Sequence, residues 1–192
     1  SYIRGIYKAL PVRAMMYRAT AAILAGSRHT ASEVPPAHQG KVIWIPENAI
    51  DPARFAATAA AHDKGPVRGV FIGRLVPYKG PDMLLEAAQP LLADGRMTID
   101  MIGDGPMRGA LEAQVKDTNI AETVTFHGQV AHEDVQGSAA RCQLLTFPSI
   151  REFGGGVVLE AMALGVVPVI VDYAGPGELV DDTTGYKVPI GD

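Results

Sequence analysis

Disulfide chemistry within the chain is excluded, because Cys142 is the only cysteine among 192 residues. Aromatic side chains are also scarce, at 6% of the sequence, whereas hydrophobic residues account for 47%. This composition is typical of an α/β protein whose core consists mainly of aliphatic side chains. Cys142 lies within an apolar stretch, so we expect it to be a buried thiol.

Long apolar segments are missing as well. No uncharged run reaches the roughly 18 residues that a membrane-spanning helix needs, and no signal peptide is recognisable. We therefore expect a cytoplasmic protein. The formal net charge of −4 argues against a general nucleic-acid binder, so no nucleic acid is expected among the partners.

Acidic residues are absent from the first part of the chain. Five basic residues precede Glu33, the first acidic residue: Arg4, Lys8, Arg13, Arg18 and Arg28. A basic segment with apolar residues could contact the anionic inner face of a membrane at its periphery. A solvated helix face would give the same pattern, and the sequence leaves both interpretations open.

Several chemistry-bearing motifs are also missing. The sequence contains no spacing typical of metal ligands and no nucleophile elbow, and His127 and His132 have no spaced partner. Gly103-Asp104-Gly105 lacks the third glycine of a dinucleotide-binding fingerprint, which argues against an NAD enzyme. We therefore expect no metal and no cofactor, and we expect both histidines to be non-catalytic.

What is present is a regular alternation of apolar strands and helical segments. The first part predicts a helix over 2–20 interrupted at Pro11, strands at 21–25 and 41–45, and a loop at 32–40. From Val67 onward, strands are predicted at 67–72, 97–102, 123–127, 143–147, 167–171 and 186–189. Helices are predicted at 81–92, from Pro106 onward, at 132–139 and at 156–164, with a last short helix after 175–178. Alternation of this kind indicates a Rossmann-like α/β fold, a parallel sheet with helices on both faces.

Glycines follow five of the predicted strands, at Gly73, Gly103, Gly128, Gly154 and Gly175. Ligands bind at the carboxyl ends of the strands in such sheets, so these turns are expected to face one crevice. Gly103-Asp104-Gly105-Pro106 could be a phosphate-binding turn or an ordinary helix start.

The most informative stretch is 151–163. Glu152 and Glu160 are separated by seven residues that include three consecutive glycines, 154–156. A glycine-rich turn between a strand and a helix binds anions through backbone N–H groups and the helix dipole. Carboxylates would repel a phosphate and instead need donors such as sugar or ribose hydroxyls. Phosphate and polyol together suggest a nucleotide-sugar, although Glu160 could also serve only the helix dipole.

Two cations follow the strand at 67–72. Arg74 can engage two phosphate oxygens with its planar fork, and Lys79 offers a compact charge. Placed at the mouth of a parallel sheet, this pair suits a diphosphate. The alternative is that Arg74 and Lys79 are two surface cations in a loop.

Taken together, these motifs resemble the donor-binding domain of retaining glycosyltransferases of family 4, which have the GT-B fold. The likeness runs from Val42 to Val188 and its parts occur in the family's order. It rests on the linker 42–51, on Phe71-Ile72-Gly73-Arg74-Leu75 with Lys79-Gly80, on Ile102-Gly103-Asp104-Gly105-Pro106, and on Glu152 with Glu160. The motif reads Glu152-Phe153-Gly154-Gly155 here, whereas Glu-Gly-Phe-Gly is the commoner form.

The resemblance implies a role for each matching residue. Arg74 and Lys79 would bind the diphosphate and stabilise the leaving charge, with Glu152 accepting hydrogen bonds from the sugar hydroxyls; these three are the catalytic candidates. The other candidates would bind the donor: Gly73 and Gly103 at the strand ends, Gly128, Gln129 and Val130 beside the base, Phe153, Gly154 and Gly155 at the distal phosphate, and Glu160 at the ribose. The family transfers sugar with retention at the anomeric carbon and without an essential metal.

The resemblance also implies a domain organisation and partners. Residues 1–51 would be a remnant of the N-terminal acceptor domain plus the linker, and residues 52–192 a donor domain truncated before its final helices. The donor would be a UDP-sugar or GDP-sugar, and the acceptor a sugar, a lipid-linked sugar or a polysaccharide. Two alternatives remain: a non-catalytic nucleotide-sugar-binding subunit that docks on a separate acceptor-domain partner, and a nucleotide-sugar epimerase of the same architecture.

Overall fold

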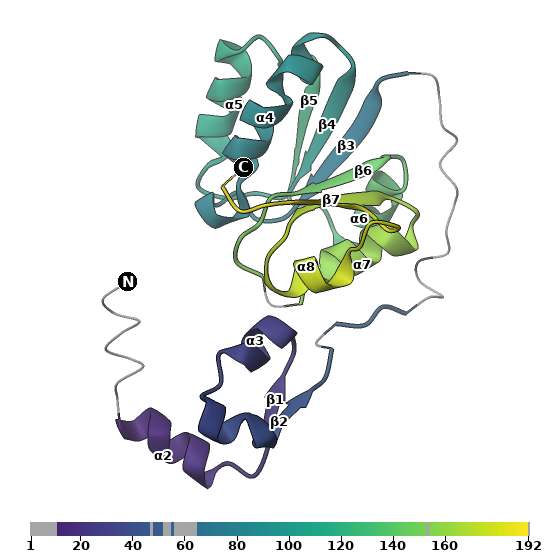
Figure 1. The fold of residues 1–192 in the computed structure, drawn as a ribbon. Helices are drawn as coiled ribbons and strands as arrows, with labels where there is room; N and C mark the ends of the chain where they lie inside the picture. The colour runs from purple at the N-terminus through teal and green to yellow at the C-terminus, as the bar shows by residue number, and fades with distance from the viewer. Residues whose placement is uncertain (1–10, 47, 52–54, 56–64, 153, 192) are drawn as a thin grey trace.

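The structure is a computed structural model that describes residues 11–46, 48–51, 55, 65–152 and 154–191. Figure 1 shows a small N-terminal unit in purple and blue and a larger domain around a twisted sheet. The predicted helical stretch at 2–10 lies outside the described residues, whereas its second part is confirmed as α2, Pro11–Ala19.

The N-terminal unit is one strand–helix–strand crossover. β1 (Ile23–Ala25) and β2 (Val42–Trp44) pair in parallel, and α3 (Arg28–Ser32) and the 3-10 helix η1 (Pro36–Lys41) connect them. Lys41 ends α2, because its ammonium donates to the carbonyls of Tyr17, Arg18 and Thr20 at 2.8–3.1 Å. Cations at a helix C-terminus satisfy the last carbonyls in this way.

Two predictions for this unit need correction. The segment 32–40 was expected to be a loop, but Pro36 opens η1 there, since a proline at the first position of a short helix loses no hydrogen bond. The strand expected at 21–25 is shorter and only partly buried: Ala25 is 1% exposed, whereas Leu24 is 68% exposed.

Glu178 joins this unit to the larger domain. Its carboxylate oxygens accept from the backbone N–H groups of Arg28 and His29, each at 2.9 Å. The rings of His29 and Tyr173 lie 4.9 Å apart beside this contact. A carboxylate at the start of α3 satisfies otherwise unpaired N–H groups and suits the helix dipole.

The larger domain contains a sheet of six parallel strands. In sequence order they are β3 (Val67–Ile72), β4 (Met97–Ile102), β5 (Val124–Gly128), β6 (Leu144–Phe147), β7 (Val167–Val171) and β8 (Tyr186–Val188). Their order across the sheet is β5-β4-β3-β6-β7-β8. All six predicted strands are confirmed to within one residue at either end, because each is a short apolar run bounded by turn residues.

Helices cover both faces of this sheet, as the sequence predicted. They are α4 (Pro81–Ala93), α5 (Arg108–Asp117), α6 (His132–Ala139), α7 (Gly156–Ala163) and α8 (Ala174–Leu179), with the 3-10 helix η2 (Pro77–Lys79) before α4. Adjacent residues of β3 point to opposite faces: Phe71 packs in the cluster that contains Leu85 of α4 and Leu111 of α5. Val70 packs in the cluster that contains residues of α6 and α7. The Rossmann-like α/β fold is therefore confirmed.

Two helix starts differ from the sequence prediction. α5 begins at Arg108 and not at Pro106, because the preceding turn is tied to the chain after β3. Leu75 donates its N–H to the Asp104 carbonyl at 2.9 Å and accepts from the Met107 N–H at 3.1 Å. The second difference is α8, which already begins at Ala174, so that Gly175 lies within the helix and is buried.

Candidate functional site

The site lies where the direction of chain progression across the sheet reverses. From β3 the chain moves outward through β4 and β5, then returns to add β6 on the other side of β3 and continues through β7 and β8. The segments that follow β3 and β6 therefore diverge at the carboxyl edge and leave a crevice between them. Sheets of this strand order bind their ligands at this switch point.

The two segments at this crevice are joined by direct contacts. Ile150 donates its N–H to the Tyr78 carbonyl at 3.0 Å, and the ammonium of Lys79 forms an ion pair with the carboxylate of Glu152. Ser149 donates to the same carboxylate at 2.9 Å and is itself buried. These contacts hold η2 and the turn after β6 in one arrangement.

A pocket of about 390 Å³ opens between these segments. This volume is within the usual range for a small-molecule site. Its lining includes Gly73, Arg74, Lys79, Glu152 and Gly155, which come from the turns after β3 and β6. Five of the residues singled out from the sequence are thus brought together at one place, and their roles there remain predictions.

Lys79 and Glu152 form one half-buried unit in the wall of the pocket. Their side chains are 16% and 18% exposed, and Ser149 accompanies the carboxylate. Burial, and secondly the nearby Arg74 guanidinium, lower the pKa of Lys79 below its ordinary value. The sequence assigned Lys79 to phosphate and Glu152 to sugar, and it did not foresee that the two side chains are direct partners.

The glycine run closes the other side of the pocket. Gly155 has a φ of +68°, and a Cβ there would lie 3.0 Å from the ring of Pro176 in α8. Any other residue at this position would be strained in the left-handed region and crowded against α8. Gly155 and Gly156 line the pocket at the start of α7, where backbone N–H groups and the helix dipole favour an anion.

The glycines after β4 and β5 allow close backbone packing. Gly103 donates its N–H to the Gly128 carbonyl at 2.8 Å, and a Cβ on Gly103 would lie 1.9 Å from the Gly73 carbonyl oxygen. Close packing of neighbouring backbone turns therefore explains Gly103 without any ligand. Neither Gly103 nor Gly128 is among the residues that line the pocket.

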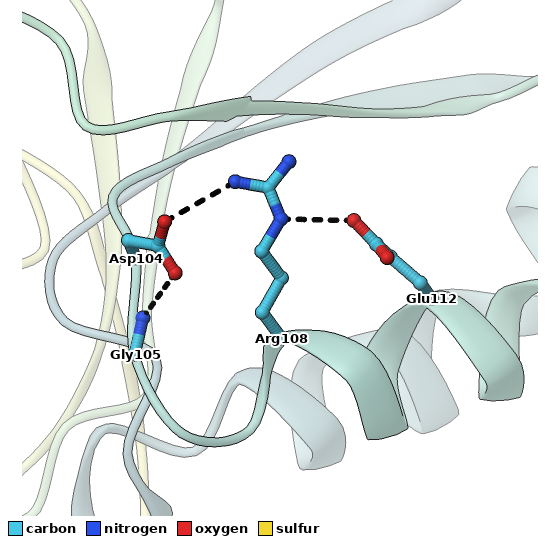
Figure 2. A network of polar contacts seen from close by, with 4 residues as sticks. All are labelled: Asp104, Gly105, Arg108 and Glu112. Atoms are coloured by element: carbon cyan, nitrogen blue, oxygen red, sulfur yellow. Dashed lines mark hydrogen bonds and ion pairs between the residues drawn. The ribbon is translucent and has the colours of Figure 1, made fainter.

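Figure 2 shows a charged network beside these turns that the sequence analysis missed. Arg108 donates to Asp104 at 3.3 Å and to Glu112 at 2.9 Å, and Asp104 also accepts from the Gly105 N–H at 2.7 Å. The hydrogen bond to Glu112 is the main cause that raises the pKa of Arg108. A Cβ on Gly128 would lie 2.9 Å from the guanidinium, so Arg108 rests on that turn. The i, i+4 spacing of the three charges was the available signal.

The remaining predicted residues lie outside this pocket. Gln129 is exposed, whereas Val130 is partly buried against the core cluster that contains Val70. Gly154 lines a separate pocket of about 160 Å³ together with Asn48. Phe153 lies outside the described residues.

Glu160 lies on α7, half-buried, with a carboxylate oxygen 4.0 Å from Nε2 of His132 on α6. This distance is at the limit of an ion pair, and it exists only while the exposed His132 is protonated. Among the described residues, the Glu160 carboxylate has no closer polar partner.

A third polar cluster lies between β4, β5 and the start of β6. His127 Nε2 lies 2.6 Å from Asp100, and the Cys142 thiol lies 3.7 Å from the other Asp100 oxygen. Burial, and secondly the Asp100 carboxylate, raise the pKa of Cys142 to about 12. Cys142 is 2% exposed, which confirms the buried cysteine expected from the sequence, and a thiol that stays protonated is a poor nucleophile.

Among the described residues, no group of three or more histidine, cysteine, aspartate or glutamate side chains could hold a metal ion. Within the same part of the chain, no helix is long and apolar enough to cross a membrane.

Several known proteins are similar to this chain in sequence. The chain is 32% identical over 161 residues to 2-deoxystreptamine glucosyltransferase of Streptomyces kanamyceticus, a match that covers 78% of this chain and 40% of that protein. It is 34% identical over 122 residues to alpha-D-kanosaminyltransferase of the same organism, covering 62% of this chain and 32% of the relative. The chain thus spans less than half the length of these relatives.

The fold also has counterparts among solved structures. Anabaena Alr3699/HepE, crystallised in complex with UDP, superimposes with a TM-score of 0.78 at 22% sequence identity, covering 92% of this chain and 52% of that one. This likeness supports the GT-B architecture. The family described as "Glycosyl transferases group 1" matches residues 55–192, well over half of the chain. Because this family model covers most of the chain, the protein belongs to the group 1 glycosyltransferases.

Proposed function

We propose that this chain is the donor-binding half of a retaining glycosyltransferase of family 4 that uses a nucleoside-diphosphate sugar. The single observation that carries the proposal is the pocket at the switch point of the sheet. It combines cations from the turn after β3 with a carboxylate and the start of α7 after β6. Phosphate and polyol would find complementary groups side by side.

In this proposal the diphosphate lies between Arg74, Lys79 and the N–H groups at the start of α7. Departure of the nucleotide adds negative charge to the phosphate oxygens, and fixed cations and dipoles stabilise that charge without reorganising. Glu152 accepts from the sugar hydroxyls and keeps Lys79 oriented, because the two are already partners. The cations and the helix terminus do the work that a metal ion does elsewhere, so we propose no metal.

The donor is proposed to be a UDP-sugar or a GDP-sugar. HepE has been crystallised with UDP-glucose, and the relatives include a glucosyltransferase, which favours a UDP-hexose. The acceptor is proposed to be a sugar, free, lipid-linked or in a polysaccharide, and to bind to parts of the protein beyond this domain. Exposed Met15, Met16 and Arg18 on α2 are compatible with peripheral contact at the inner membrane face of a cytoplasmic protein.

Calorimetry with UDP, GDP, ADP and NAD tests the proposal. We expect selective binding of one nucleoside diphosphate, weakened about 10- to 100-fold by Arg74→Ala and by Lys79→Ala, since each removes a charge-assisted contact. Arg96→Ala is the matched control, because Arg96 is an exposed arginine that precedes β4 at the opposite edge of the sheet. Equal affinity for all four nucleotides, or an equal loss of affinity in Arg96→Ala, would contradict the proposal.

A second candidate, a non-catalytic subunit that docks on a partner, is favoured by apolar side chains on the N-terminal unit. Leu24 is 68% exposed, Met15 67% and Trp44 47%. A strictly monomeric chain in sedimentation would count against this candidate. Sugar transfer by the chain to a defined acceptor would exclude it.

A further inference from the structure

The pocket contains a second arginine that neither the motifs nor the proposed function uses. Arg151 lines the pocket from the turn after β6, whereas Arg74 lines it from the turn after β3. The guanidinium carbon of Arg151 lies 5.7 Å from the ring centroid of Tyr78, which also lines the pocket. A guanidinium over an aromatic face is held by cation–π attraction, while its N–H groups stay free to donate in the ring plane.

The backbone around Arg151 is held on both sides. The preceding residue, Ile150, donates its N–H to the Tyr78 carbonyl, and the following residue, Glu152, is paired with Lys79. The Arg151 side chain is nevertheless exposed and makes no hydrogen bond or ion pair with the described residues. A cation that is anchored but not neutralised suits an anionic ligand.

The charge balance of the pocket points the same way. Glu152 compensates Lys79, so Arg74 and Arg151 are the lining side chains whose charges no described residue compensates. The diphosphate of a nucleotide-sugar is dianionic at neutral pH. One arginine on each wall of the pocket would therefore match it, and arginine can bind two phosphate oxygens at once.

We propose that Arg151 is a binding residue for the diphosphate of the donor and acts from the β6 side while Arg74 acts from the β3 side. This inference rests on the proposed function and deepens it by assigning a second guanidinium to the same site. It also gives Tyr78 a positioning role, because the ring holds the Arg151 guanidinium at the pocket.

Inorganic pyrophosphate is the sharpest probe, because it carries the phosphate chemistry without base or sugar. Calorimetry would compare the unsubstituted chain with Arg151→Ala, Arg151→Lys, Arg74→Ala and the control Arg96→Ala, at low and moderate salt. We expect Arg151→Ala to weaken pyrophosphate and the selected nucleoside diphosphate about three- to tenfold, the range for a partly exposed charged contact. Its salt dependence should also be shallower, and Arg151→Lys should recover part of the affinity.

The outcomes distinguish the role of Arg151 from the proposed function. If Arg74→Ala weakens pyrophosphate and Arg151→Ala does not, the inference is wrong and the proposed function stands. If the unsubstituted chain binds neither pyrophosphate nor any nucleoside diphosphate, the proposed function fails and the inference fails with it. If Arg151→Ala weakened binding of the complete nucleotide-sugar only, Arg151 would lie at the sugar and the assignment to the diphosphate would be wrong. If Arg96→Ala weakened binding as much as Arg151→Ala, the effect would come from overall charge and the inference would also be wrong.

Discussion

Two pairs of turns at the same edge of the sheet differ in what their glycines do. The turn after β4 is packed backbone to backbone against both neighbouring turns. Gly103 lies against the Gly73 carbonyl of the turn after β3 and is hydrogen-bonded to Gly128 at the end of β5. The turns after β3 and β6 diverge and leave the pocket between them, and Gly155 lines this pocket at the start of α7. A glycine after a strand therefore marks either close backbone packing or a position in the pocket wall, and strand order decides which.

The charged side chains near the two pairs of turns also differ. We call the region around the turns after β4 and β5 the closed half, and the region around the pocket between the turns after β3 and β6 the open half. In the closed half, Arg108 is matched by Asp104 and Glu112, and the buried thiol of Cys142 stays protonated beside Asp100. In the open half, Arg74 and Arg151 face the pocket without a carboxylate partner among the described residues. The compensated charges stabilise the packed turns, whereas the uncompensated pair lines the pocket to which we assign the diphosphate.

The largest effect should come from Gly103→Ala in the closed half. The added methyl would meet the Gly73 carbonyl at 1.9 Å, at a φ of +131° that alanine avoids. We expect the free energy of unfolding to fall by about 2–4 kcal/mol, measured by urea denaturation.

Gly109→Ala is the matched control for that substitution. Gly109 lies in α5 with no atom within 4 Å of an added Cβ, so we expect stability to be unchanged or higher by about 0.5–1 kcal/mol. Equal stabilities of Gly103→Ala and Gly109→Ala would show that close backbone packing does not explain Gly103.

An intermediate effect is expected from Glu152→Gln in the open half. Removing the carboxylate frees the charge of Lys79, so pyrophosphate should bind about three- to tenfold more tightly in calorimetry. The chain should also unfold more easily, because the half-buried Lys79 loses its charged partner.

Glu86→Gln on the exposed side of α4 is the control for this change in overall charge. Weaker pyrophosphate binding by Glu152→Gln than by Glu86→Gln would mean that Lys79 does not face the phosphate. The open half would then need another explanation for its cations.

At neutral pH, where the Cys142 thiol is protonated in both the folded and the unfolded chain, its titration should have no effect on stability. Its folded-state pKa of about 12 lies above the ordinary value of 9.0, so the stability that it contributes is fully present below pH 9.0 and is lost as the pH rises toward 12. The difference in free energy of unfolding between the unsubstituted chain and Cys142→Ser should be constant below pH 9.0 and should shrink above it.

Thiol labelling provides an independent reading of the same cysteine. At pH 8 the folded chain should react with a disulfide reagent far more slowly than the chain in urea, because both burial and protonation protect the sulfur. Equal rates in the two conditions would contradict the closed packing between β4, β5 and β6.

The sequence by itself determined the strands of the larger domain, its helices over most of their length and the segments that line the pocket. Short apolar runs ending in glycine are local signals, and the cations at 74 and 79 and the carboxylate at 152 stand next to them in the chain. Their nearness in space followed from the rule that parallel strands end at one edge of the sheet.

Only the tertiary structure decided which of these residues meet. The pairing of Lys79 with Glu152, the stacking of Arg151 on Tyr78 and the packing of Gly103 on Gly73 all join segments that are far apart in sequence. Even the start of α5 at Arg108 depends on hydrogen bonds to Leu75 in the neighbouring turn. Such contacts depend on strand order and on the direction in which each turn leaves the sheet, and local propensity carries no information about either.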